Sequence, residues 1–123
     1  MQVGDLTSWE RTFTIEDVQR FSEISGDQGI HHVQTDGQGR LLVQGLLTAT
    51  LPTKLGGDMN FIARTMTFEF LRPVFTGDTV RCESTVESVE KQENRTHMVI
   101  AFVCRNQNGK EVLTGHVQGI IRA

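Results

Sequence analysis

The sequence predicts an α+β fold in which an antiparallel sheet wraps around a central helix. The second half of the 123-residue chain contains four strand-like segments, of which residues 65–70 alternate most clearly between apolar and polar side chains, at the period of a β-strand. An Asn-Gly pair, typical of a tight hairpin, separates the last two segments. Before these strands lies an apolar helix without a strongly polar face, as expected of a helix that its surroundings enclose.

The composition favours one domain and excludes several classes of partner. A chain of this length with 37% hydrophobic residues fits a single core, so we expect one domain over residues 1–123. Its 12 Lys and Arg against 15 Asp and Glu leave a net charge of -3, without the basic excess of nucleic-acid-binding proteins. No apolar run approaches the ~18 residues of a membrane span, and the first residues do not resemble a secretion signal. We therefore expect a cytoplasmic protein without a nucleic-acid or membrane partner.

The first predicted helix begins near Thr14 and ends at Gly26. The Thr14 hydroxyl can accept hydrogen bonds from backbone N–H groups that a first helical turn leaves unpaired. Apolar residues then recur at helical spacing and form one stripe that needs a covering surface: Ile15, Val18, Phe21 and Ile24. The segment from Gly26 to Arg40 is rich in Gly, Gln, Asp and His, which predicts a polar loop. Long polar loops in compact domains are often functional.

The second predicted helix, from Leu46 to Leu55, should be central. Pro52 cannot donate a backbone hydrogen bond, so we expect the helix to bend there or the Thr48 carbonyl to find another partner. Gly56 and Gly57 end it. The strands are predicted near residues 65–70, 79–90, 96–106 and 111–122, and Cys82 and Cys104 fall on two of them. Because they form no CxxC motif, we expect reduced, buried thiols.

Candidate catalytic residues are concentrated in the polar loop. The chain has no GxSxG, P-loop, HExxH or CxxC motif, which argues against serine hydrolase, nucleotide and zinc sites. Asp27 and His32 lie five positions apart in this loop, where a carboxylate and an imidazole can converge on one water. From the residues alone, the alternative is that Asp27 only turns the chain and that His31 and His32 are solvated.

The chain contains three short motifs in order: Ser25-Gly26-Asp27 with His32, then Gln44-Gly45-Leu46, then Phe70 to Asp78. Their order along nearly the whole chain resembles that of the MaoC-like (R)-specific enoyl-CoA hydratases. Ser25-Gly26-Asp27 followed by His32 resembles the family pattern S-G-D-x-N-P-x-H, with Gly29-Ile30 in place of Asn-Pro. Gln44-Gly45-Leu46 resembles the H-G-M/L that opens the central helix, with Gln44 in place of histidine. Phe70 to Asp78 (F-L-R-P-V-F-T-G-D) resembles the family's F-x-x-P-V-x-x-G-D. This resemblance implies a hot-dog fold, dimerised side by side with active sites at the subunit interface, so we expect a homodimer or a higher oligomer.

The resemblance also implies roles for individual residues. Asp27 and His32 fall on the catalytic pair, and Gly45 on the glycine whose backbone N–H binds the thioester carbonyl. Gln44 and Thr53 join Gly45 as predicted substrate-binding residues. The implied activity is (R)-specific hydration of trans-2-enoyl-CoA, or the reverse dehydration of a (R)-3-hydroxyacyl thioester, in fatty-acid metabolism.

Coenzyme A or an acyl carrier protein would then be part of the substrate, and no metal or other cofactor is expected. Because coenzyme A bears several phosphates, an acidic protein would need cations at the pocket mouth, and the available candidates are Arg40, Lys54, Arg64 and Arg72. The alternative for each of them is a solvated surface residue. Two alternatives remain open. One is an acyl-CoA thioesterase, because hot-dog thioesterases also place a carboxylate near the central helix. The other is a non-catalytic module that binds acyl thioesters.

Overall fold

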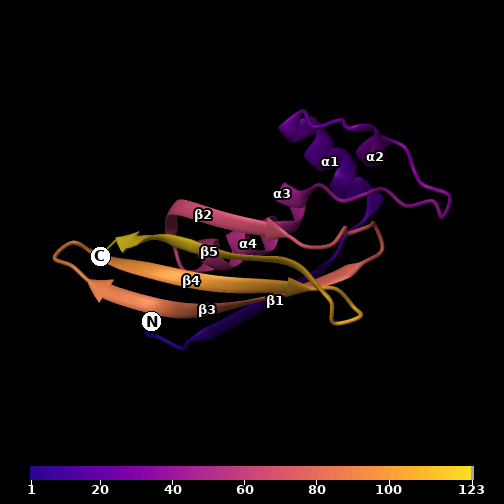
Figure 1. Ribbon diagram of the computed structural model, residues 1–123. Helices are drawn as coiled ribbons and strands as arrows, with labels where there is room; N and C mark the ends of the chain where they lie inside the picture. Colours follow the sequence, from indigo (N-terminus) through magenta and orange to yellow (C-terminus); the bar gives the residue numbers. More distant parts are fainter. Residues whose placement is uncertain (123) are drawn as a thin grey trace.

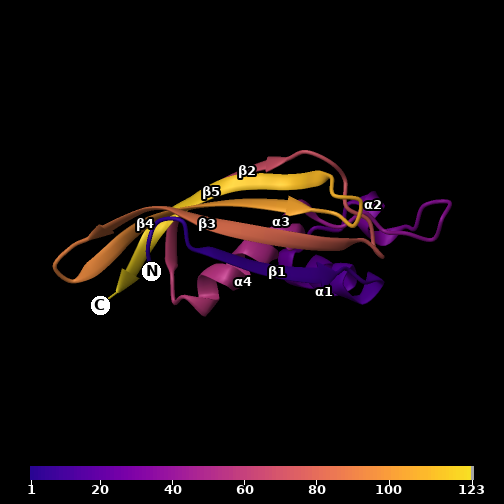
Figure 2. The same cartoon turned by 90° about the horizontal axis from the view of Figure 1, so that it is seen from below.

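Five strands and four helical segments make up the computed structural model, which describes residues 1–122. The sheet is antiparallel, with the strand order β1-β3-β4-β5-β2. Figures 1 and 2 show the helices on one face of the sheet, with α1 and α2 rising as a lobe at one end. The elements are β1 (Leu6–Thr12), α1 (Ile15–Ser25), α2 (Ile30–Val33), α3 (Gly45–Thr48), α4 (Thr50–Asp58), β2 (Ile62–Phe70), β3 (Thr79–Lys91), β4 (Arg95–Arg105) and β5 (Glu111–Arg122). This arrangement confirms the predicted α+β hot-dog fold.

The predicted strands correspond to β2–β5, but the sequence analysis missed β1. This strand pairs with β3 from Leu6 opposite Thr85 to Thr12 opposite Thr79. Its sequence, LTSWERT, has no regular alternation of apolar and polar residues, and Trp9 is its main contact with the core. An edge strand with most of its side chains exposed carries little periodic signal, so pairing with β3 decides its conformation.

The central helix is interrupted, as Pro52 predicted. Segments α3 and α4 meet at Ala49, three residues before the proline. Because Pro52 lacks an N–H group, the Thr48 carbonyl loses its usual helical partner, and the ring crowds that carbonyl. The hydroxyl groups of Thr50 and Thr53 donate to the carbonyls of Leu47 and Ala49, which strengthens the turns on either side.

Helix α1 has the predicted start and end. Thr14 and Asp17 form a reciprocal capping box, and Gly26 adopts the left-handed conformation after the last turn, with φ of 77°. Only part of its apolar stripe is covered, however. Val18 is buried, whereas Ile24 is 85% exposed. Helix α1 belongs to the lobe that rises from one end of the sheet (Figure 1), and residues 1–122 leave Ile24 largely uncovered.

The core lies between the concave face of the sheet and α4. On β4, alternate residues Met98, Ile100, Phe102 and Cys104 are buried toward this side. Cys82 lies opposite Cys104 in the register, and both are free and fully buried, as expected. The adjacent Cys82 thiol and burial raise the pKa of Cys104. Among the described residues, no helix is long and apolar enough to cross a membrane.

Candidate functional site

Asp27 is held in a tight turn directly after α1. Its backbone N–H donates to the Ser25 hydroxyl at 3.0 Å, and its Oδ1 accepts from the Gly29 N–H at 3.2 Å. The second contact is a turn in which an Asp side chain bonds its own backbone two residues on. It fixes the carboxylate without the Asn-Pro pair of the resembled family. The side chain remains half-exposed, and its other oxygen, Oδ2, is free to face His32.

His32 lies on α2 and is oriented by a backbone carbonyl. Its ring is only 6% exposed, and Nδ1 lies 2.7 Å from the Leu42 carbonyl oxygen. Because a carbonyl oxygen only accepts, Nδ1 carries the proton in this contact, and the neutral ring presents the lone pair of Nε2. That Nε2 lies 3.5 Å from Asp27 Oδ2. The separation is too long for a strong direct hydrogen bond, so both atoms can contact one further oxygen that lies to the side of the line joining them.

Gly45 provides a backbone N–H next to this pair. It is the first residue of α3, and its N–H has no hydrogen-bond acceptor within residues 1–122. The ring of Phe70 covers it closely, since a Cβ atom added at Gly45 would lie 2.7 Å from Phe70 Cε1. Glycine therefore allows both the close packing of Phe70 and the approach of a ligand to the N–H.

Two surface hollows meet at Gly45 and Phe70. The carboxylate hollow, about 380 Å³ in volume, is lined by Asp27, Gln44, Gly45 and Phe70 among others. The histidine hollow, about 390 Å³, is lined by His31, His32, Gly45, Phe70 and Arg72 among others. The structure thus brings together Asp27, His32 and Gly45, with Gln44 next to Gly45 in the carboxylate hollow, whereas Thr53 lines a different cavity. A ligand whose polar group binds the Gly45 N–H can extend into either hollow.

Gln44 lines the carboxylate hollow, and its side-chain amide also makes contacts within the protein, so its predicted role in binding substrate stays a prediction. It is buried, and its Nε2 donates to the Val18 carbonyl at 3.2 Å and to the Ser22 hydroxyl at 3.0 Å. Both amide N–H groups are therefore used to attach α1 to the start of α3. The remaining Oε1 is buried without a partner among the described residues. Gln44 thereby connects the helix that ends at Asp27 to the turn that presents Gly45.

We expect Gln44→Leu to reduce turnover roughly tenfold, because α1 and Asp27 would shift relative to Gly45. The free energy of unfolding should change by at most about 1 kcal/mol, since leucine removes the unpaired Oε1 together with the two hydrogen bonds. Enzyme kinetics and thermal unfolding of the same sample measure the two effects. Gln19→Leu, at an exposed position of α1, is the matched control. An equal loss of turnover in both variants would remove Gln44 from this role.

Thr53 does not line either of the hollows that contain Asp27 and His32. It is exposed on α4, and its hydroxyl donates to the Ala49 carbonyl. It lines a separate apolar cavity of about 130 Å³ between α4 and the sheet. Its predicted contact with substrate stays a prediction.

The sequence analysis missed the Leu42 carbonyl that orients His32, and it quoted Phe70 only as part of a motif. A backbone contact between distant segments leaves no signal in the residue types.

The described residues contain no group of three or more His, Cys, Asp or Glu side chains placed to hold a metal ion. The arrangement offers instead a carboxylate, an imidazole lone pair and a free backbone N–H around one space. Such a set can activate water, move a proton and stabilise a developing oxyanion. These are the requirements for adding water to a carbonyl-activated double bond, or for removing water from a 3-hydroxy carbonyl compound to form one.

The fold and the site together define a hot-dog hydratase or dehydratase, and comparisons with known proteins agree. The model of the "FAS1-like, dehydratase domain region" matches residues 42–115, more than half of the chain. The protein belongs to this family and is a lyase of the hydratase–dehydratase type.

Individual relatives share both sequence and fold with the chain. It is 24% identical to "3-hydroxyacyl-[acyl-carrier-protein] dehydratase FERN, mitochondrial" of Solanum lycopersicum, over 98% of this chain and 78% of the relative. Its structure resembles R-hydratase PhaJ1 of Pseudomonas aeruginosa, with a TM-score of 0.82 and 25% identity over 99% of this chain and 82% of that one. The fold is also that of the HadBC (3R-hydroxyacyl-ACP dehydratase) complex of Mycobacterium tuberculosis, with a TM-score of 0.76, 15% identity and 98% coverage of both chains.

Proposed function

We propose that the protein catalyses (R)-specific hydration of trans-2-enoyl thioesters, or the reverse dehydration of (R)-3-hydroxyacyl thioesters, in fatty-acid metabolism. The observation that carries this proposal is the 3.5 Å separation between Asp27 Oδ2 and His32 Nε2, beside the free N–H of Gly45. The activities named for the tomato and Pseudomonas relatives support the same reaction.

In the hydration direction, Asp27 and His32 hold one water molecule that both side chains contact. The Gly45 N–H donates to the thioester carbonyl oxygen and stabilises the negative charge that forms there when the water oxygen adds to C3. The proton released by the water passes through the pair to C2, so that one water is consumed and the two groups return to their starting states. Asp27 and His32 act as a coupled unit, because each is within reach of the same water.

The test is to mix the purified protein with crotonyl-CoA and to follow the enoyl-thioester absorbance together with free thiol. Loss of the enoyl band without thiol release, with (R)-3-hydroxybutyryl-CoA as the product, is the expected result. Release of thiol would instead identify a thioesterase. An unchanged spectrum with longer enoyl chains as well as with crotonyl-CoA would favour a module that binds acyl thioesters without converting them.

The reaction as proposed needs no metal or redox cofactor, because water, an acid–base pair and a hydrogen-bond donor are sufficient for it. Coenzyme A or acyl carrier protein enters only as part of the substrate. We further propose the cytoplasm as the compartment, in line with the sequence analysis, although the tomato relative is named as mitochondrial. Fractionation of the source cells would test this.

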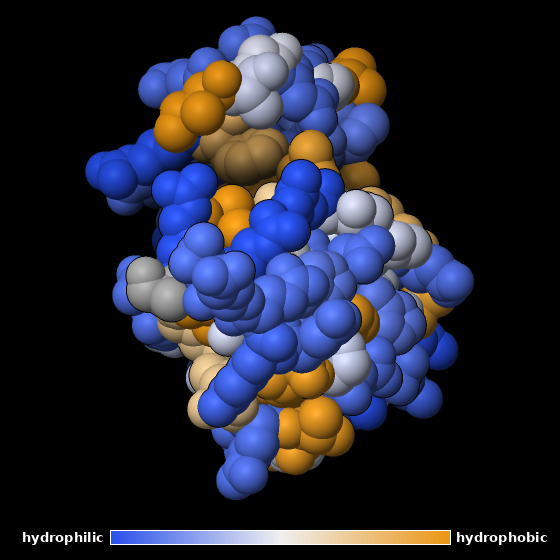
Figure 3. Space-filling model, turned by 90° about the vertical axis from the view of Figure 1, so that its left-hand side faces the viewer, coloured by the Kyte–Doolittle hydropathy of each residue, from blue (hydrophilic) through white to orange (hydrophobic). Residues whose placement is uncertain are grey.

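We also propose that the protein forms a homodimer through β2. This strand is one edge of the sheet, and most of its residues are exposed, including Ile62 and Met66. Phe70, at the end of this strand, and Leu46 are also exposed, and both line the carboxylate hollow. Figure 3 shows apolar atoms, in orange, at the surface where the lobe meets the body of the molecule. An exposed strand edge next to apolar side chains is a surface that a second copy can extend and cover.

We expect Met66→Glu to convert the dimer to a monomer, because two carboxylates would be brought into an apolar contact across the twofold axis. Light scattering after size-exclusion chromatography measures the mass. Leu6→Glu, at an exposed position of the opposite edge strand β1, is the control and should remain dimeric. A monomeric wild-type protein, or loss of the dimer only in the β1 variant, would contradict the interface.

A further inference from the structure

We propose that Arg72 binds the phosphate of the phosphopantetheine carrier and that the carrier arm leaves the site through the histidine hollow. The inference rests on the proposed function, because it assigns one part of the same thioester substrate to a residue. The phosphate can come from coenzyme A or from the phosphopantetheine of an acyl carrier protein. Both share an anionic arm attached to the reacting thioester.

The two hollows that meet at Gly45 differ in charge. The carboxylate hollow contains Asp27 and no Lys or Arg. The histidine hollow contains Arg72 and no Asp or Glu. In a protein of net charge -3, an anionic arm is repelled from the first and attracted to the second. With the thioester carbonyl on the Gly45 N–H and the double bond at the Asp27–His32 pair, the histidine hollow is the favourable exit for the arm.

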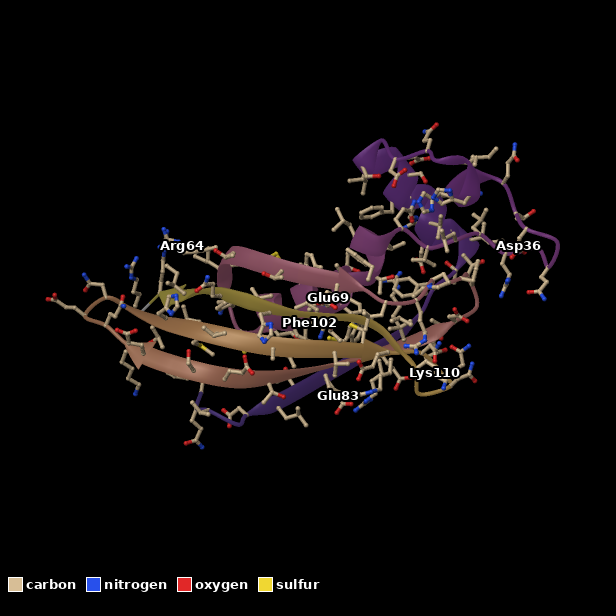
Figure 4. The ribbon with its side chains drawn as sticks, in the orientation of Figure 1. Asp36, Arg64, Glu69, Glu83, Phe102 and Lys110 are labelled. Carbon is tan, nitrogen blue, oxygen red and sulfur yellow. The ribbon has the colours of Figure 1, made fainter. Side chains whose placement is uncertain are left out.

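The other candidate cations are occupied or remote. Arg40 pairs with Asp36 at 2.9 Å and lies over the ring of Phe75. Lys54 pairs with Asp58 at 2.6 Å and lies over the ring of Trp9. Arg64 belongs to the first part of β2, and Figure 4 shows it at the end of the molecule away from the α1–α2 lobe. Of the four cations that the sequence suggested, Arg72 alone lines the histidine hollow.

The guanidinium of Arg72 is oriented but not neutralised. Its Nη1 donates to the Glu111 carbonyl oxygen at 2.7 Å, and no carboxylate within residues 1–122 forms an ion pair with it. The Glu111 carboxylate instead pairs with Arg105 at 3.4 Å. One N–H group therefore fixes the plane of the guanidinium, and the remaining donors are free. A planar fork of N–H donors matches two oxygens of a phosphate, which an ammonium group does not.

The experiment compares three crotonyl thioesters that share the reacting group: the thioesters of coenzyme A, of acyl carrier protein and of pantetheine, which lacks phosphate. Arg72→Gln should raise KM for the phosphate-bearing substrates roughly tenfold, the scale of one lost hydrogen bond between charged groups. The kcat should stay within about twofold, because Arg72 does not touch the reacting atoms. The crotonyl-pantetheine kinetics should not change. Arg72→Lys should recover part of the loss, and Arg64→Gln should match the wild type.

The outcomes distinguish which phosphate Arg72 contacts, and they test the role of Arg72 separately from the proposed catalytic activity. An effect with coenzyme A alone assigns the contact to the phosphates of its nucleotide part, and an effect with both carriers assigns it to the phosphate next to pantetheine. An equal effect on crotonyl-pantetheine, or none on any substrate, overturns the role of Arg72. Calorimetric titration with free coenzyme A is the second measurement. If the wild type binds it and Arg72→Gln binds it roughly tenfold more weakly, the inference holds even without turnover of any substrate. Equal binding by the two proteins overturns it.

Discussion

Asp27→Asn should lower hydratase turnover by roughly two to four orders of magnitude, the scale of general acid–base catalysis, while leaving the fold intact. Asparagine keeps the side-chain oxygen that accepts from the Gly29 N–H, so the turn after α1 should persist. At the position of Oδ2, which faces His32 Nε2, asparagine places an amide N–H group, which cannot accept a proton. The variant can position a water molecule but cannot help to remove its proton.

This prediction is checked by kcat and kcat/KM with crotonyl-CoA, together with thermal unfolding to show that the variant is folded. Glu23→Gln is the matched control, because Glu23 is an exposed acid of α1, the helix that precedes Asp27, and lies outside the carboxylate hollow. Its turnover should equal that of the wild type. A wild-type rate in Asp27→Asn would remove this carboxylate from the mechanism and leave it only the role of forming the turn.

His32→Ala should have an equally large effect on turnover and a measurable effect on stability. The ring is buried, and its Nδ1 contacts the Leu42 carbonyl, so the truncation leaves a carbonyl without its partner and a cavity beside it. An unpaired buried acceptor costs about 1–3 kcal/mol of the free energy of unfolding. Loss of turnover in this variant alone would therefore not distinguish catalysis from support of the loop.

His32→Asn distinguishes the two roles, because its amide can still donate to the Leu42 carbonyl but cannot accept and return a proton near neutral pH. We expect stability close to the wild type and turnover as low as in the alanine variant. His116→Ala is the control, because His116 is an exposed histidine of β5 that lines neither hollow, and this variant should retain the wild-type activity. Full activity in His32→Asn would show that the imidazole is needed only for structure.

The double variant Asp27→Asn with His32→Asn tests whether the two groups act as one unit. If both serve the same water, the second substitution should cost little once the first has been made. Multiplicative losses would show instead that Asp27 and His32 contribute to separate steps. Steady-state kinetics with a single substrate suffice for this comparison, because only the ratios of turnover matter.

The sequence by itself determined the parts of the fold that arise from neighbouring residues. Alternation over residues 65–70 identified a strand, and the segment starting at Thr14 identified a helix start. Pro52 correctly indicated an interrupted helix. The resemblance of short motifs, rather than composition, singled out Asp27, His32 and Gly45, because an Asp and a His in one loop carry little information alone.

Only the tertiary structure decided which groups meet. The Leu42 carbonyl that sets the tautomer of His32 lies ten residues away, and Gln44 contacts Val18 across 26 residues. Neither contact follows from residue type or spacing, since both depend on how the lobe packs against the start of α3. Likewise, the sequence could not distinguish among four candidate cations for binding phosphate. In the structure, Arg40 and Lys54 form ion pairs with acids, whereas Arg72 lines the histidine hollow. Periodicity records local geometry, whereas the chemistry of a site depends on distances between segments that only packing fixes.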